Sequence, residues 1–146
     1  MNRGAQVAIA AAGVLACGGV PGVGAGPEDG LSDDARAGCA ALQAVLTERF
    51  SEPPTRSLPG DHTCRLASRG QLRSAGLPDG ALTEALSGWH LADNMAADGL
   101  DGTQFGRQRG DTTCRVALFW DLVSMDTFET ANERVEVACG PLDAVR

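Results

Sequence analysis

The sequence has no lysine and no tyrosine, and its only histidines are His62 and His90. It also lacks the Gly-x-Ser-x-Gly elbow of hydrolases, the phosphate-binding loop, the dinucleotide-binding glycine fingerprint and the His-Glu-x-x-His motif of zinc proteases. These absences exclude the enzyme families that such motifs define. We therefore predict no catalytic residue, no cofactor and no enzymatic activity.

Positive charge is scarce. The chain has 12 basic residues, all of them arginine, against 19 acidic residues, which gives a net charge of −7. A chain that begins at Cys17 loses Arg3 and no acid, so 11 arginines face 19 acids and the net charge is −8. Such a chain repels phosphate backbones and is not attracted to anionic lipid. We expect no nucleic-acid partner, and membrane contact only through an attached lipid.

No apolar run is long enough to cross a bilayer, which takes about 20 residues. The run from Gly4 to Ala16 follows Arg3 and reads as an export signal over residues 1–16. It ends in Val14-Leu15-Ala16-Cys17. These four residues resemble the lipobox of bacterial lipoproteins, and the resemblance implies cleavage before Cys17 and a lipid such as palmitate on its thiol. The alternative is ordinary cleavage after Val23-Gly24-Ala25, which would release a secreted protein.

The next segment, residues 18–30, holds six glycines and two prolines among few bulky side chains. It cannot pack a core, so we predict a flexible tether over residues 17–30. Residues 31–146 then suffice for one small globular domain.

Four of the five cysteines belong to this domain: Cys39, Cys64, Cys114 and Cys139. An even number in a small exported domain predicts two disulfides. None of the four lies in a Cys-x-x-Cys pair, which argues against a metal site. Three connectivities are possible. We prefer 114–139, because both cysteines continue the apolar face of a predicted strand, and this leaves 39–64 to join the first helix to an early strand.

The predicted fold is α+β, with two helices packed on a twisted antiparallel sheet of about five strands and linked by two disulfides. A capping Ser32 begins the first helix, which ends near Phe50 and buries a stripe of apolar residues. The second helix covers residues 81–87. Strands are expected at residues 63–67, 89–91, 103–109, 112–120 and 132–139, with a hairpin at Gly110-Asp111 and a loop over residues 121–130.

Several polar residues have the side chains that a metal site or a catalytic site needs. Asp93, Asp98 and Asp101 fail the spacing of a calcium-binding loop, so we predict an acidic turn and no metal. His62 lies two residues before Cys64, but an oxidised cysteine is no nucleophile.

A partner-binding patch is the remaining candidate. Phe105, Arg107 and Arg109 alternate on one strand face, and Arg115 is expected beside them. The alternative is a solvated hairpin whose arginines pair with nearby acids.

The C-terminal half resembles exported bacterial domains of unassigned function. The shared residues are Gly88-Trp89, Asp98-Gly99-Leu100-Asp101-Gly102-Thr103, Cys114, Val116, Trp120-Asp121, Val137 and Cys139. The resemblance implies an exported fold with a cysteine link and no particular activity. Our first functional hypothesis is a lipid-anchored, non-catalytic module that binds a protein or another component of the cell envelope. The alternatives are a freely secreted inhibitor of a foreign enzyme and, last, a small hydrolase.

Overall fold

The computed structural model describes residues 30–70, 79–124 and 129–146, with the backbone alone for residues 121–124 and 129–132. The predicted export signal, Cys17 and almost all of the tether lie outside these residues. No helix in the described part of the chain is long and apolar enough to cross a membrane.

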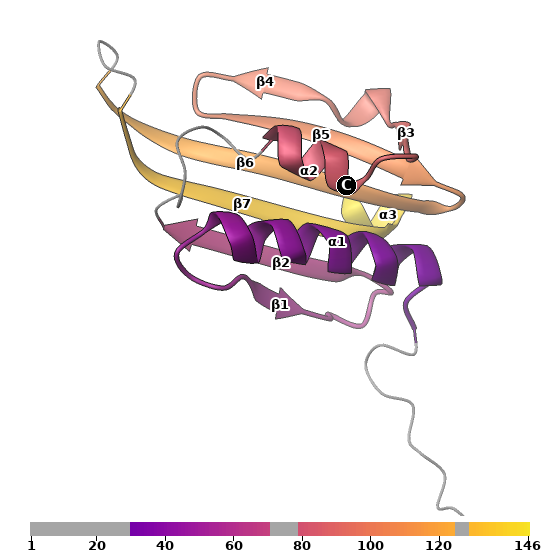
Figure 1. Cartoon of the computed structure of the whole chain (residues 1–146). Helices are drawn as coiled ribbons and strands as arrows, with labels where there is room; N and C mark the ends of the chain where they lie inside the picture. The colour runs from indigo at the N-terminus through magenta and orange to yellow at the C-terminus, as the bar shows by residue number, and fades with distance from the viewer. Residues whose placement is uncertain (1–29, 71–78, 125–128) are drawn as a thin grey trace, which may run out of the picture.

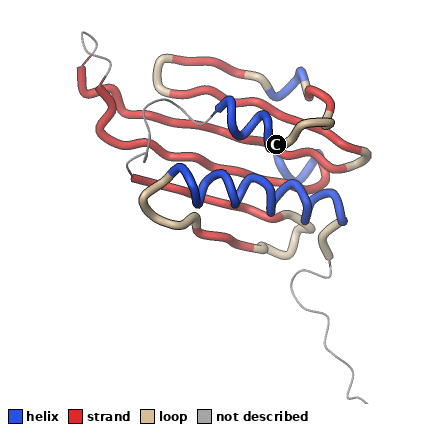
Figure 2. Tube along the Cα trace, viewed as in Figure 1, coloured by secondary structure: helices blue, strands red, loops and turns tan. Residues whose placement is uncertain are grey.

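A single antiparallel sheet organises the molecule, and its strands run in the order β1-β2-β7-β6-β5-β3, with β4 also paired to β5. Helices α1 and α2 cover one face of the sheet, and the short α3 lies behind it (Figures 1 and 2). The strands are β1 (Thr55–Ser57), β2 (Cys64–Gly70), β3 (His90–Leu91), β4 (Ala97–Gly99), β5 (Gly102–Arg109), β6 (Thr112–Ser124) and β7 (Glu129–Pro141). The helices are α1 (Asp33–Arg49), α2 (Asp79–Ala85) and α3 (Leu142–Val145), with a 3-10 turn, η1, at Asp93–Met95.

The α+β class is thus confirmed, with 3 helices and 7 strands among the described residues in place of the expected two and about five. The short elements account for the difference. β1 and β4 have 3 residues each, too few to show an alternating pattern in the sequence.

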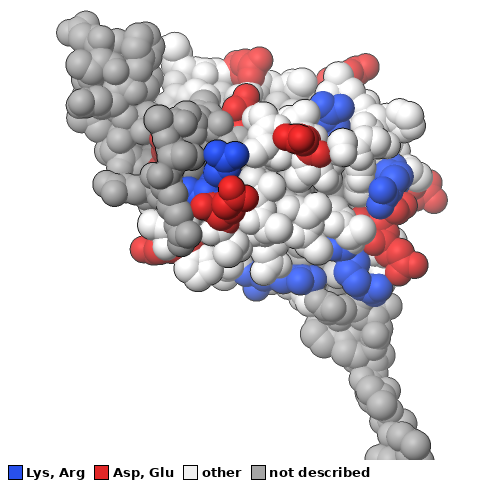
Figure 3. Space-filling model, viewed as in Figure 1, with Lys and Arg blue, Asp and Glu red and all other residues white. Residues whose placement is uncertain are grey.

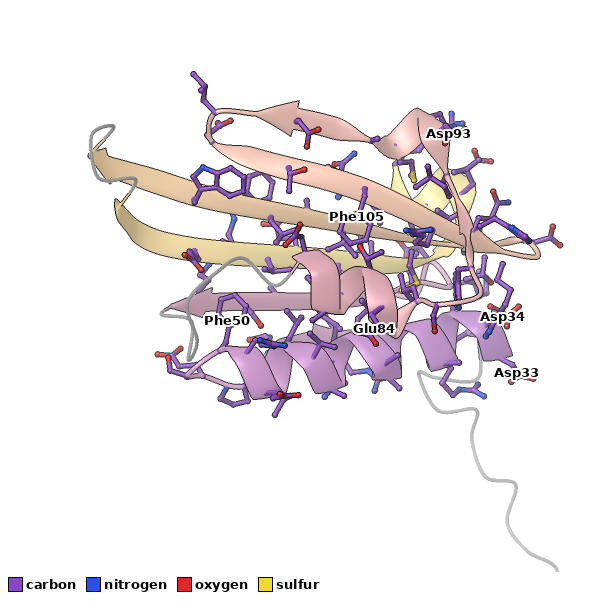
Figure 4. The ribbon with its side chains drawn as sticks, turned by 45° about the horizontal axis from the view of Figure 1, so that its top comes forward. Asp33, Asp34, Phe50, Glu84, Asp93 and Phe105 are labelled. Atoms are coloured by element: carbon purple, nitrogen blue, oxygen red, sulfur yellow. A yellow bond between two sulfur atoms is a disulfide. The ribbon has the colours of Figure 1, made fainter. Side chains whose placement is uncertain are left out.

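Helix α1 begins and ends as the sequence predicts. The Ser32 side chain accepts a hydrogen bond from the Ala35 amide at 3.1 Å, and Asp33 and Asp34 lie in the first turn (Figure 4). Both features stabilise the positive end of a helix. The predicted stripe faces the sheet, where Cys39, Leu42, Leu46 and Phe50 are fully buried.

The hairpin at Gly110-Asp111 is also confirmed, since Arg109 pairs with Thr112 across it. The predicted loop over residues 121–130 is wrong. β6 continues to Ser124 and β7 already begins at Glu129, with pairing irregularities at Leu122 and Ser124. Bulges of this kind break the alternation of side chains without ending the strand pairing.

Three of the four cysteines lie in one row across the sheet. Cys139 on β7 is the register partner of Cys64 on β2 and of Cys114 on β6. Cys39 approaches this row from α1. The disulfides are Cys39–Cys64 and Cys114–Cys139, the preferred connectivity. One bridge therefore fixes α1 to the sheet, and the other joins two neighbouring strands.

Close contact between α1 and this row depends on Gly38. A Cβ at that position would lie 2.7 Å from the Cys114 Sγ and 3.0 Å from the Trp89 ring. We therefore expect Gly38→Ala to lower the free energy of unfolding by about 1–3 kcal/mol in denaturant titrations. Gly80→Ala in α2 is the matched control, because no atom lies within 4 Å of its added methyl group. Equal stability of the two variants would contradict the tight contact.

Candidate functional site

The sheet face opposite α1 and α2 carries four arginines, and we call it the arginine face. Arg65 on β2 and Arg115 on β6 are both register partners of Ala138 on β7, while Arg69 pairs with Arg134. Residues paired directly across a sheet project from the same face, and alternate residues project from opposite faces. Cys64, Leu66 and Ser68 are buried toward the helices. The arginines between and beyond them therefore point away from the helices.

A second, smaller core covers one end of the arginine face. Ala92 and Met95 beside η1, together with Val145 and Leu142 of α3, pack with Ala138. Gly106 on β5 permits this approach, because a Cβ there would lie 2.8 Å from the Met95 Cβ. Beyond this end the sheet is open, with Thr55, Ser57 and Ala67 exposed.

The charge of this face is opposite to that of the whole chain. In the described strands the face presents Arg65, Arg69, Arg115 and Arg134, and Glu136 is the acid among them. The whole chain has a net charge of −7. On the helix-covered face, acidic and basic side chains are interspersed among uncharged ones (Figure 3). The fold thus places these positive charges on the face of the sheet that α1 and α2 do not cover.

Two of the four arginines have acidic partners. The Arg134 Nε lies 3.2 Å from a Glu136 carboxylate oxygen, and its guanidinium stacks on Phe119, 4.4 Å from the ring centroid. Arg65 contacts Asp61 at 3.1 Å and donates a hydrogen bond to the Ala144 carbonyl at 3.2 Å.

The other two arginines lack such partners. Arg115 reaches the Gln104 amide oxygen at 3.4 Å and forms no ion pair within the described residues. Arg69 forms neither an ion pair nor a side-chain hydrogen bond within the same residues, although it is exposed. Both guanidinium groups therefore keep capacity to bind an anion.

Residues of the arginine face line several hollows in the described part of the surface. One hollow of about 230 Å³ is lined by Arg65, Arg115, Glu136 and the side chains of Thr55 and Ser57, above Ala67 and Ala138. A second, of about 410 Å³, includes Arg69, Arg134 and Phe119. Asp101, Trp120 and Glu133 also line the second hollow, so it is mixed in charge. It also extends beyond the arginine face, because Trp120 and Glu133 project toward the helices.

The register divides the predicted patch of Phe105, Arg107, Arg109 and Arg115: the first three share one face as expected, but the expectation that Arg115 lies beside them is wrong. Phe105, Arg107 and Arg109 pair with Val116, Cys114 and Thr112 on the helix side, whereas Arg115 pairs with Gly106 on the other side. Phe105 is half-buried and packs against the main core (Figure 4). Arg109 contacts Asp34 at 2.7 Å and lies over the Trp89 ring. The alternative, an arginine–acid pairing, is therefore the arrangement at Arg109.

The histidines do not form an acid–base pair. Both are exposed, and the His62 Nδ1 lies 2.8 Å from the Gly30 carbonyl oxygen. Within the described residues neither histidine contacts a carboxylate. Cys64 is fully buried and oxidised. No group of three metal-binding side chains is found among the described residues, Asp93, Asp98 and Asp101 included.

Asp61 instead organises the turn before β2. Its carboxylate accepts hydrogen bonds from the Thr63 side chain and amide and from Arg65. The Thr63 hydroxyl contributes most to lowering the pKa of Asp61, and Arg65 adds to the effect. These hydrogen bonds fix the Asp61 side chain within the turn.

Comparison with family models, with curated proteins and with solved structures found no match to this chain. No activity can therefore be transferred from a relative. The residues of the arginine face are the remaining guide to function, and sequence reasoning identified one of its arginines, Arg115. The other arginines could have been found from the alternation of buried and charged residues along two strands. Cys64 alternates with Arg65, and Val135 and Val137 alternate with Arg134 and Glu136.

The position of Phe105 generates a stability prediction. We expect Phe105→Ala to lower the free energy of unfolding by about 2 kcal/mol, because the half-buried ring packs against the core. Leu100→Ala removes an apolar side chain that is 78% exposed and should be nearly neutral. Denaturant titration of both variants tests this. An equally neutral Phe105→Ala would mean that the ring does not support the core.

Asp61 gives a prediction of pH dependence. A carboxyl with a lowered pKa in the folded state stabilises the fold above its ordinary pKa, and this contribution is lost as the pH falls through the folded-state pKa. Asp61→Asn should thus lower the thermal midpoint slightly near pH 6. The gap between variant and wild type should close near pH 2 (both values approximate). A gap that does not depend on pH would contradict the charged hydrogen bonds.

Proposed function

We propose that the chain is an exported, lipid-anchored module of the bacterial cell envelope that binds another molecule without catalysis, and that the arginine face is its binding surface. The observation that carries the proposal is the one-sided architecture of the sheet. α1 and α2 cover one face, and much of the other carries no helix, with Arg65 and Arg69 exposed and Arg115 and Arg134 half-buried among small side chains. A surface of this kind suits recognition of a partner.

Arginine chemistry favours binding over catalysis. A guanidinium group stays protonated in proteins, so it binds anions but does not transfer protons. The groups beside the arginines are an amide, hydroxyls and a carboxylate paired with Arg134. This set supports recognition by charge and hydrogen bonding.

The disulfides support a place outside the cytoplasm. All four cysteines of the domain are paired, and such pairs are consistent with an extracellular or otherwise oxidising environment. Lipid attachment at Cys17 is the part of the proposal that rests on the lipobox residues.

The intact mass of the native mature protein tests the anchor. We expect an N-terminus at Cys17 that carries acyl groups, and a mass lowered by the four hydrogens of two disulfides. Cys17→Ser should abolish the added mass and release the protein from the membrane fraction. Ala25→Arg blocks ordinary cleavage after residue 25 and should leave the lipidated form unchanged. An unmodified N-terminus at Gly26 would contradict the anchor and favour the secreted inhibitor.

A further inference from the structure

We infer that the arginine face binds an extended, acidic polypeptide segment of a partner protein. The inference rests on the proposed function, because it names the partner of the same surface. The observation behind it is a pair of neighbouring arginines whose charges the described residues neutralise only in part. Arg69 and Arg134 are direct cross-strand partners on β2 and β7.

Like charges placed directly opposite each other destabilise a sheet. Arg134 is partly neutralised by Glu136, whereas Arg69 has no ion pair within the described residues. The chain holds 19 acidic residues, and two of them, Asp101 and Glu133, line the same hollow as Arg69, but within the described residues neither forms an ion pair with it. An external carboxylate between the two guanidinium groups would relieve the repulsion, which makes this position the centre of the inferred site.

The size of the open face indicates a segment and not a folded partner. From the row of Arg65 and Arg115 to the row of Arg69 and Arg134 the sheet extends four residues, about 13 Å. The four strand spacings from β1 to β5 add about 19 Å in the other direction. The product, on the order of 250 Å², is well below the roughly 800 Å² per partner of a stable protein interface. About six extended residues would cross it.

The chemistry of the face favours a peptide over other anions. Glu136 lies between the two arginine rows and would repel a uniformly negative surface such as a membrane or a nucleic acid. A polypeptide can place its carboxylates at the guanidinium groups and an uncharged side chain beside Glu136. Ala67, Thr55 and Ser57 are small, so a peptide backbone can approach the sheet closely there. Phe119 offers an aromatic surface next to Arg134.

The test uses a fluorescent hexapeptide in which glutamates alternate with alanines, because alternate residues of an extended chain point to one side. We expect saturable binding to the full mature chain that weakens with added salt. In nuclear magnetic resonance spectra, the side-chain Nε signals of Arg69, Arg115 and Arg134 should shift during the titration. A peptide with glutamines in place of the glutamates should not bind.

Paired substitutions locate the site. Arg69→Gln with Arg134→Gln should weaken binding about tenfold. Arg69→Gln alone should leave the denaturation midpoint unchanged, because this side chain has no ion pair within the described residues. Arg36→Gln with Arg109→Gln removes the same charge from the helix-covered side and should change the affinity less than about twofold. Equal losses in both pairs would overturn the site, since net charge alone would then control binding.

Two further outcomes overturn the inference. If the acidic peptide does not bind, the inference of an acidic partner is wrong. If phosphatidylglycerol vesicles bind and the binding depends on Arg69 and Arg134, the ligand of the face is a lipid surface instead. The intact mass of the mature protein does not depend on either result. The inferred acidic partner and the proposed lipid anchor are therefore tested by different measurements.

Discussion

The contact between α1 and the row of cysteines sets the arrangement of the rest of the molecule. Cys39 bonds to Cys64, and Gly38 lies against the second disulfide, so the helix is held on one side of the sheet at its centre. The apolar stripe of α1 and the inward residues of β2, β6 and β7 then form the main core. α2 and Trp89 complete the same layer, which leaves the other side of the sheet to smaller elements.

On the other side of the sheet, small apolar residues are shielded from water in a different way. Ala138 is buried there in the second core, whereas Ala117 is nearly fully buried outside that core. Long polar side chains flank them in the register, including Gln104, Arg115 and Glu136. The aliphatic stems of such side chains can shield small apolar residues while their charged ends stay in water. The arginines thus contribute to burial as well as to the charge of the surface.

Much of the fold follows from local patterns in the sequence. The start of α1, its buried stripe, the hairpin at Gly110-Asp111 and both disulfides were predicted, because each depends on residues close together or on a strong alternation. The shortest strands and the irregular ends of β6 and β7 were not, since three residues or a bulge leave no periodic signal. Export and lipidation at Cys17 remain predictions.

The candidate site shows the limit of reading one strand at a time. The alternation of Cys114 and Val116 already implied that Arg115 points away from the core, and the two-residue hairpin implied that Phe105 points toward it. What no local pattern contained was the position of β7 between β2 and β6. That long-range pairing brings Arg69 beside Arg134 and Arg65 beside the row of Arg115, and so creates the arginine face.

The position of Cys139 between Cys64 and Cys114 has a consequence for oxidative folding. Within the sheet alone, either neighbour lies in register to capture the Cys139 thiol. The native choice is made when α1 docks and brings Cys39 to Cys64. An oxidant that acts before the helix docks can therefore form either the native Cys114–Cys139 bond or a Cys64–Cys139 bond that leaves Cys39 and Cys114 without their native partners. Packing before oxidation, or a thiol–disulfide isomerase that reverses the wrong bond, favours the native pairing.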